Sequence, residues 1–80
     1  MTREEAASRL IVIMRDVFDD DTLQYDDHLT ADQVEEWDSL SHVSFLVAVE
    51  KEFSFRYTSA EIDGLKNIGE ALDIIVKRGS

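Results

Sequence analysis

The sequence predicts an all-α fold, a four-helix bundle with three longer helices, one short helix and a long first connection. Apolar residues recur at helical intervals in three segments. The 80-residue chain also has no proline and three glycines, which suits helices joined by polar loops better than the many tight turns of an all-β fold. With 44% hydrophobic residues, we expect one domain over residues 1–80 with a single modest core.

The first predicted helix lies near the start of the chain. Thr2 and Glu5 have the spacing of a capping box, and the acidic run Asp19–Asp21 is unfavourable near the negative end of a helix dipole, so it should end the helix. Apolar residues at intervals of three and four place one face of this helix on the core. They are Ala7, Leu10, Ile11, Met14, Val17 and Phe18.

The segment from Asp19 to Trp37 is polar and aperiodic, so it is interpreted as a long loop. Connections of this length are uncommon in small domains and are often functional. Its first part, Asp19–Thr30, is similar to a calcium-binding loop but lacks the glycine at the sixth position and the glutamate at the twelfth, so no metal site is expected. Four scattered apolar residues should pin the loop to the core. They are Leu23, Tyr25, Leu29 and Val34.

A second helix is expected to open at Asp38, a favourable N-cap residue. It has two apolar stripes, so we expect it to be the central helix of the bundle, buried on a wide face. One stripe is Leu40, Val43 and Val47, and the other is Leu46, Val49 and Phe53 with Phe45 beside it. The Phe55–Tyr57 segment that follows is interpreted as a packed connector.

Two further helices complete the prediction. Thr58 and Glu61 have capping-box spacing and Gly64 should terminate a helix of little more than one turn. Asn67 and Glu70 open the last helix. Its core face should be Ile68, Ala71, Leu72 and Ile75.

The charge excludes several classes of partner. The formal net charge is −10, and no basic residue lies between Arg15 and Lys51. Nucleic acids and anionic lipids are bound largely through Lys and Arg, so neither is expected as a partner. An acidic field instead attracts basic protein surfaces. Disulfides and thiolate zinc sites are excluded because the chain has no cysteine. No apolar run reaches the length of a membrane span and no signal-peptide pattern is present, so the expected location is the cytoplasm.

The sharpest motif is Trp37-Asp38-Ser39-Leu40, at the junction of the acidic loop and the second helix. Ser39 would occupy the first turn, where unpaired amides and the helix dipole stabilise an anion such as a phosphate ester. A plain capping role for the Asp-Ser pair is the alternative. Ser39 and His42 could share a helix face, but no carboxylate or oxyanion hole is evident beside them, so a hydrolytic dyad is disfavoured.

In this order the features resemble the acyl carrier protein family, from Met1 to about Arg78. The resemblance depends on the Asp-Ser-Leu motif some forty residues into the chain, the Phe53–Tyr57 connector and the final helix at Ile68. It implies that Ser39 receives 4′-phosphopantetheine from coenzyme A, and that the protein is a carrier and not an enzyme. The chain departs from the common pattern at Ser41 and Ser44, which are often acidic in carriers of fatty acid synthesis.

The resemblance also assigns roles to other positions. Recognition by the transferase or by partner enzymes is implied for Asp38, Leu40, Val43, Val47, Glu50, Glu35 and Glu36. Leu46, Val47 and Ile62 match positions that face the bundle interior, where family members shelter an acyl chain, and Phe53 is expected in the core. Trp37 is interpreted as an anchor that closes the loop over the bundle.

The implied partners are a phosphopantetheinyl transferase and acyl-activating, condensing or acyl-transfer enzymes with basic docking surfaces. The carrier is expected to be a monomer that serves fatty acid, polyketide or related secondary-metabolite biosynthesis. Two alternatives stay open on the sequence: an aminoacyl or peptidyl carrier of a nonribosomal-type pathway, and an acidic helical interaction module that is never modified.

Overall fold

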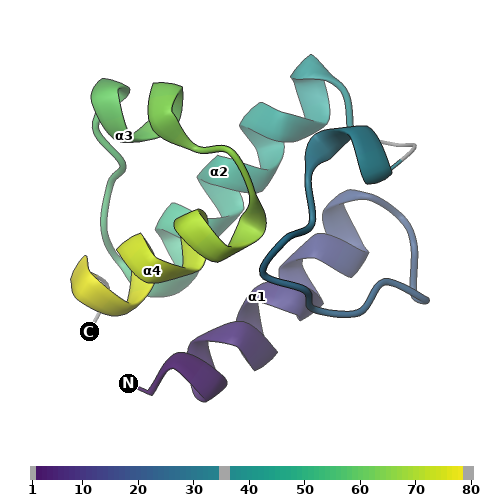
Figure 1. Cartoon of the computed structure of the whole chain (residues 1–80), viewed down its shortest axis with the longest axis horizontal. Coiled ribbons are helices and arrows are strands. Elements are labelled where there is room, and N and C mark those ends of the chain that lie inside the picture. Colours follow the sequence, from purple (N-terminus) through teal and green to yellow (C-terminus); the bar gives the residue numbers. More distant parts are fainter. Residues whose placement is uncertain (1, 35–36, 79–80) are drawn as a thin grey trace.

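The computed structural model describes residues 2–34 and 37–78, and these residues form helices joined by loops, with no strand among them (Figure 1). The elements are α1 (Arg3–Val17), the 3₁₀ turn η1 (Ala31–Gln33), α2 (Ser39–Phe53), α3 (Ser59–Gly64) and α4 (Ile68–Arg78). The predicted all-α bundle of three longer helices and one short one is confirmed. Within the described residues, no helix is long and apolar enough to cross a membrane.

The predicted helix starts are confirmed, because each depends on a local capping contact. The Thr2 hydroxyl accepts from the Glu5 amide (3.1 Å) at α1, and Thr58 and Glu61 form a reciprocal capping box at α3. At α4 the Asn67 side-chain oxygen accepts from the Glu70 amide (2.9 Å). These side chains satisfy amides that a helix start leaves without intrahelical partners.

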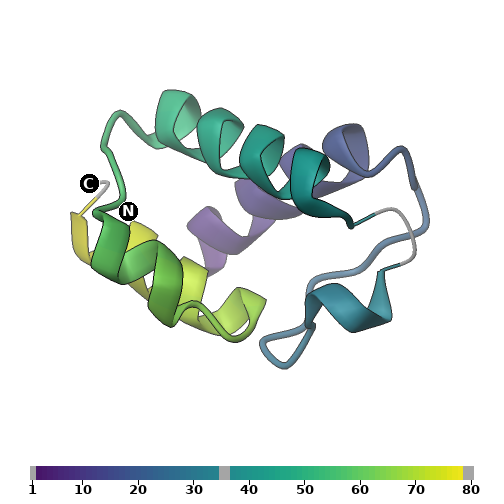
Figure 2. The same cartoon turned by 90° about the horizontal axis from the view of Figure 1, so that it is seen from above.

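The core lies between the three longer helices, with α1 packed against both α2 and α4 (Figure 2). Each helix contributes one buried stripe, as the periodicity predicts. Val34 of the long connection and Tyr57 of the α2–α3 connector are also buried, and the Tyr57 hydroxyl donates to the Ala71 carbonyl (3.2 Å). The helix residues of the core are Ala6, Leu10, Ile11, Met14, Phe45, Leu46, Val49, Phe53, Ile68, Ala71, Leu72 and Ile75.

The prediction that α2 is buried on a wide face is wrong. Its inner stripe is buried, whereas Leu40, Val43 and Val47 are 78%, 58% and 42% exposed. The expectation that Val47 faces the interior fails for the same reason. Leu46, by contrast, is buried as expected. In the part of the chain that the structure describes, α2 packs mainly against α1, and no element covers its other side. We call Leu40, Val43 and Val47 the outer stripe.

The long connection is fastened to the start of α4 by backbone contacts. The amides of Gly69 and Ile68 donate to the carbonyls of Asp27 and Leu29, both at 2.9 Å. A Cβ on Gly69 would lie 2.8 Å from the Asp27 carbonyl oxygen, which is closer than real side chains come. Glycine is therefore required here for the close approach of two backbones.

Side chains reinforce the same junction at Asp27. Its carboxylate accepts from the Arg3 guanidinium (3.0 Å) and from the Tyr25 hydroxyl, and Arg3 also pairs with Asp73 of α4 (3.1 Å). These hydrogen bonds, that of Tyr25 above all, hold the pKa of Asp27 below its usual range. The contacts of Asp27 with Arg3, Tyr25 and Gly69 form what we call the Asp27 anchor, which joins α1, the connection and α4.

Candidate functional site

Ser39 is the first residue of α2, and its side chain is exposed. The cap is made by its neighbours: the Asp38 carboxylate accepts from the Ser41 amide (2.8 Å), and the Ser41 hydroxyl accepts from the Asp38 amide (2.8 Å). The hydrogen bonds from the Ser41 amide and hydroxyl hold the pKa of Asp38 below its usual range. The predicted N-cap is confirmed, and the cap does not use the Ser39 hydroxyl.

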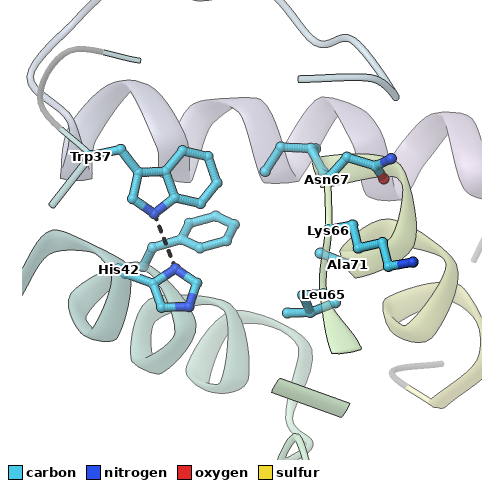
Figure 3. Close-up of a pocket in the computed structure, with 8 residues that line it drawn as sticks. Trp37, His42, Leu65, Lys66, Asn67 and Ala71 are labelled. Atoms are coloured by element: carbon cyan, nitrogen blue, oxygen red, sulfur yellow. Dashed lines mark hydrogen bonds between the residues drawn. The ribbon is translucent and has the colours of Figure 1, made fainter. Parts of the chain in front are cut away.

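Trp37 and His42 form a wall beside this serine. The indole N–H donates to His42 Nδ1 (3.0 Å), and the two rings stack with centroids 5.9 Å apart (Figure 3). The indole also packs against the buried rings of Phe18 and Phe45, with centroids 4.8 and 5.6 Å away. Trp37 is thus half-buried and tied to α1 and α2, as the interpretation of a loop anchor requires.

The hydrogen bond from Trp37 also affects whether His42 could act with Ser39 as a hydrolytic dyad. A neutral imidazole that accepts at Nδ1 carries its proton on Nε2. Nε2 is then a donor and cannot take the proton of the Ser39 hydroxyl. No group of three or more metal-ligating side chains is present among the described residues either. The hydrogen bond from Trp37 to His42 therefore argues against a hydrolytic Ser39–His42 dyad.

The residues that were expected to contact the transferase or partner enzymes lie in different structural environments. The outer stripe lines the exposed side of α2, directly after Ser39. Glu50 is half-buried, and its carboxylate accepts a hydrogen bond from the Tyr57 amide (2.8 Å). One of its two oxygens is therefore used to hold the α2–α3 connector. Glu35 and Glu36 lie outside the described residues. Of the two serines that replace common acidic positions, Ser44 is exposed and Ser41 belongs to the cap.

A partly enclosed cavity of about 70 Å³ lies between the start of α2 and the α3–α4 connection. Phe45, Ile68 and Ala71 are its buried apolar residues, and Trp37 and His42 line both this cavity and the open depression at Ser39. Leu65, Lys66 and Asn67 complete the lining.

The residues expected to shelter an acyl chain do not line this cavity. Leu46 is buried in the core and Ile62 is half-buried on α3, whereas Phe53 is buried in the core as expected. The sequence did not predict that the α3–α4 connection lines a cavity. In the sequence, Leu65–Asn67 has the pattern of a short linker before a helix cap.

Comparison with known proteins identifies the family. No family model matches the chain, and none of the curated protein sequences does. Among solved structures, the chain is similar to the solution NMR structure of the holo acyl carrier protein from Geobacter metallireducens. The two are 33% identical with a TM-score of 0.86, and the match covers 91% of this chain and 84% of that one. The four helices and the extent of this match show that the chain belongs to the acyl carrier protein family and is a carrier rather than an enzyme.

Proposed function

We propose that Ser39 carries a 4′-phosphopantetheine arm and that the protein holds acyl intermediates on it as thioesters. The observation that supports this most directly is an exposed serine at the first position of a capped helix, whose cap is made by Asp38 and Ser41. The similar solved structure is that of a holo carrier. An open depression lined by Trp37, Asp38, Ser39 and His42 gives the attachment point room.

The chemistry of attachment follows from these residues. Ser39 Oγ attacks the phosphorus of coenzyme A that bears pantetheine, its proton is released to the transferase, and adenosine 3′,5′-bisphosphate leaves. The phosphodiester then sits at the start of α2, where the helix dipole favours an anion. The arm supplies the thiol that forms the thioester. The chain has no cysteine to compete with that thiol.

We propose that partner enzymes dock on the outer stripe and on the acidic surface around Asp38. A row of exposed apolar side chains beside the attachment point is typical of an interaction site. The net charge of −10 favours a phosphopantetheinyl transferase and acyl-activating, condensing or acyl-transfer enzymes with basic docking surfaces. A carrier must leave each enzyme after its visit, and electrostatic steering speeds encounter without requiring tight binding.

The test is modification followed by mass spectrometry. Incubation with coenzyme A, Mg²⁺ and a broad-range phosphopantetheinyl transferase should add one phosphopantetheinyl group. Ser39→Ala should abolish the addition while the helical circular dichroism stays unchanged. Ser44→Ala, an exposed serine on the same helix, is the matched control and should be modified normally. Wild-type protein that stays unmodified with several unrelated transferases would show that the proposal is wrong.

A further inference from the structure

His42 brings a hydrogen-bond donor to the surface around Ser39. It follows Ser39 by three positions on α2, and both residues line the open depression. Its Nδ1 accepts from the Trp37 indole N–H (3.0 Å), so the neutral imidazole carries its proton on Nε2. Nε2 lies on the side of the ring away from the indole (Figure 3), and it has no hydrogen-bond partner among the residues that the structure describes.

The backbone donors that follow Ser39 are already engaged. The Asp38 carboxylate accepts from the Ser41 amide (2.8 Å), and the Asp38 carbonyl accepts from the His42 amide (2.9 Å). A phosphate on Ser39 therefore lies in the favourable field of the helix dipole but does not find these two amides free. The bonds from Ser41 also lower the pKa of Asp38, so a charged carboxylate precedes the phosphate. A donor from a side chain is favourable at this point, because the two negative groups repel each other.

The imidazole is held in one orientation by Trp37. The two rings stack with centroids 5.9 Å apart, and the indole packs in turn on the buried rings of Phe18 and Phe45, at 4.8 and 5.6 Å. Turning the imidazole over would break its hydrogen bond with the indole and leave a half-buried donor without a partner. The donor at Nε2 is thus oriented before any ligand is present, which lowers the entropy lost on binding.

We propose that His42 Nε2 donates a hydrogen bond to a phosphate oxygen of the arm on Ser39, with Trp37 as the positioning residue that sets the tautomer of the imidazole. The inference rests on the proposed attachment at Ser39, and it adds a binding residue for the phosphodiester. A hydrogen bond to a charged phosphate oxygen is stronger than one between neutral groups. It restricts rotation of the bonds that join the arm to the helix.

Nuclear magnetic resonance of the apo and holo forms tests the contact in the wild-type chain. At about pH 8 most imidazole side chains are neutral, so Nε2 protons and nitrogens report on the tautomer and its partner. The Nε2 proton of His42 should exchange with water more slowly in the holo form, and its nitrogen resonance should shift. The other histidine of the chain, His28, is exposed in the long connection and is an internal control whose resonances should not change.

Variants then assign the effect, with the phosphorus resonance of the holo form as the measurement and circular dichroism as the check of folding. His42→Phe keeps a flat ring without a donor and should shift the phosphorus resonance, whereas His42→Gln retains a donor and should shift it less. Trp37→Phe keeps a ring against Phe18 and Phe45 but has no indole N–H, so the Nε2 proton of His42 should exchange faster. Lys66→Gln removes an exposed cation that lines the neighbouring cavity but not the depression. It is the matched control and should leave the phosphorus resonance unchanged.

The outcomes distinguish this inference from the proposed function. If no arm is added, the attachment at Ser39 is wrong and the phosphate contact is wrong with it. If the arm is added but the Nε2 proton of His42 exchanges equally fast in both forms, the attachment stands and the contact is overturned, whether or not any variant folds. A phosphorus resonance that Lys66→Gln shifts as much as His42→Phe would also overturn it.

Discussion

The two apolar stripes of α2 differ in burial and in their structural role. The inner stripe faces α1 and the core, and its residues Phe45, Leu46, Val49 and Phe53 are at most 6% exposed. The outer stripe begins next to Ser39 and is 42–78% exposed. Burial of the inner stripe fixes the position of the helix. The outer stripe contributes little to that and is available to partners.

The difference separates the side of α2 that holds the helix in place from the side that faces solvent beside Ser39. Soluble monomers rarely expose large contiguous apolar patches, and such patches mark interaction sites. Ser39 lies at the end of the outer stripe, on a helix held firmly from behind. We therefore expect substitutions in the inner stripe to change the free energy of unfolding, and substitutions in the outer stripe to change the binding of partners.

The largest expected effect comes from a matched pair on α2. Phe45→Ala removes a fully buried ring that packs against Phe18 and Trp37, and it should lower the free energy of unfolding by about 3–5 kcal/mol. Val43→Ala, two positions away on the outer stripe, should change it by less than about 0.5 kcal/mol. Urea denaturation followed by circular dichroism measures both. Similar losses for the two variants would contradict the division.

A smaller effect is expected where the long connection meets α4. Gly69→Ala places a methyl group 2.8 Å from the Asp27 carbonyl oxygen, so it should destabilise the fold by about 1–3 kcal/mol as the backbones are pushed apart. Gly64→Ala meets no atom within 4 Å and has no left-handed backbone. It should be neutral or stabilise α3 by up to about 1 kcal/mol. Equal melting temperatures for the two variants would show that the Asp27 anchor does not hold the connection.

Local features of this fold were predictable from the sequence, because a cap or a helix face depends on residues within a few positions of one another. The four core residues of α4 and the caps at Thr2, Asp38, Thr58 and Asn67 were predicted correctly. So was the position of Ser39 in the first turn of α2.

Features that depend on distant contacts were not predictable. Periodicity shows that both stripes of α2 are apolar, but which one is covered depends on where α1 and α4 lie. The Asp27 anchor joins residues 42 positions apart, Asp27 and Gly69, and no local pattern signals it. The cavity behind Trp37 is also formed by segments that meet only in the folded chain.

Acidic pH should lower the stability of the fold by weakening the Asp27 anchor. Bonds from Tyr25 and Arg3 lower the pKa of Asp27 in the folded state. A lowered folded pKa means that the unfolded chain binds the proton more readily, so the stabilisation is fully present above the unfolded pKa of about 3.9. It is lost as pH falls through the folded pKa. Melting temperatures between about pH 6 and pH 2 should therefore fall less steeply for Asp27→Asn than for wild type. Parallel curves would contradict a charged Asp27 in the anchor.

The smallest effect concerns the charge of the outer side of α2. No acidic residue lies between Ser39 and Val49, and Glu50 and Glu52 are engaged by the Tyr57 amide and by Arg9. A basic partner therefore meets apolar side chains here with little charge beside them, so its docking should depend mainly on the outer stripe.

Ser44→Glu tests this dependence, because it adds one carboxylate beside the outer stripe at an exposed position. Ser41 is unsuitable, since its hydroxyl completes the cap of α2. An exposed charge pair contributes about 0–1 kcal/mol, so the variant should associate up to about five times faster with a basic ketosynthase or acyl transferase. The gain should disappear at high salt. Ser8→Glu, on the exposed surface of α1, changes the net charge equally and should give a smaller gain in stopped-flow measurements. Equal gains would mean that partners sense only the overall charge, and the outer stripe would then lose its place as the docking surface.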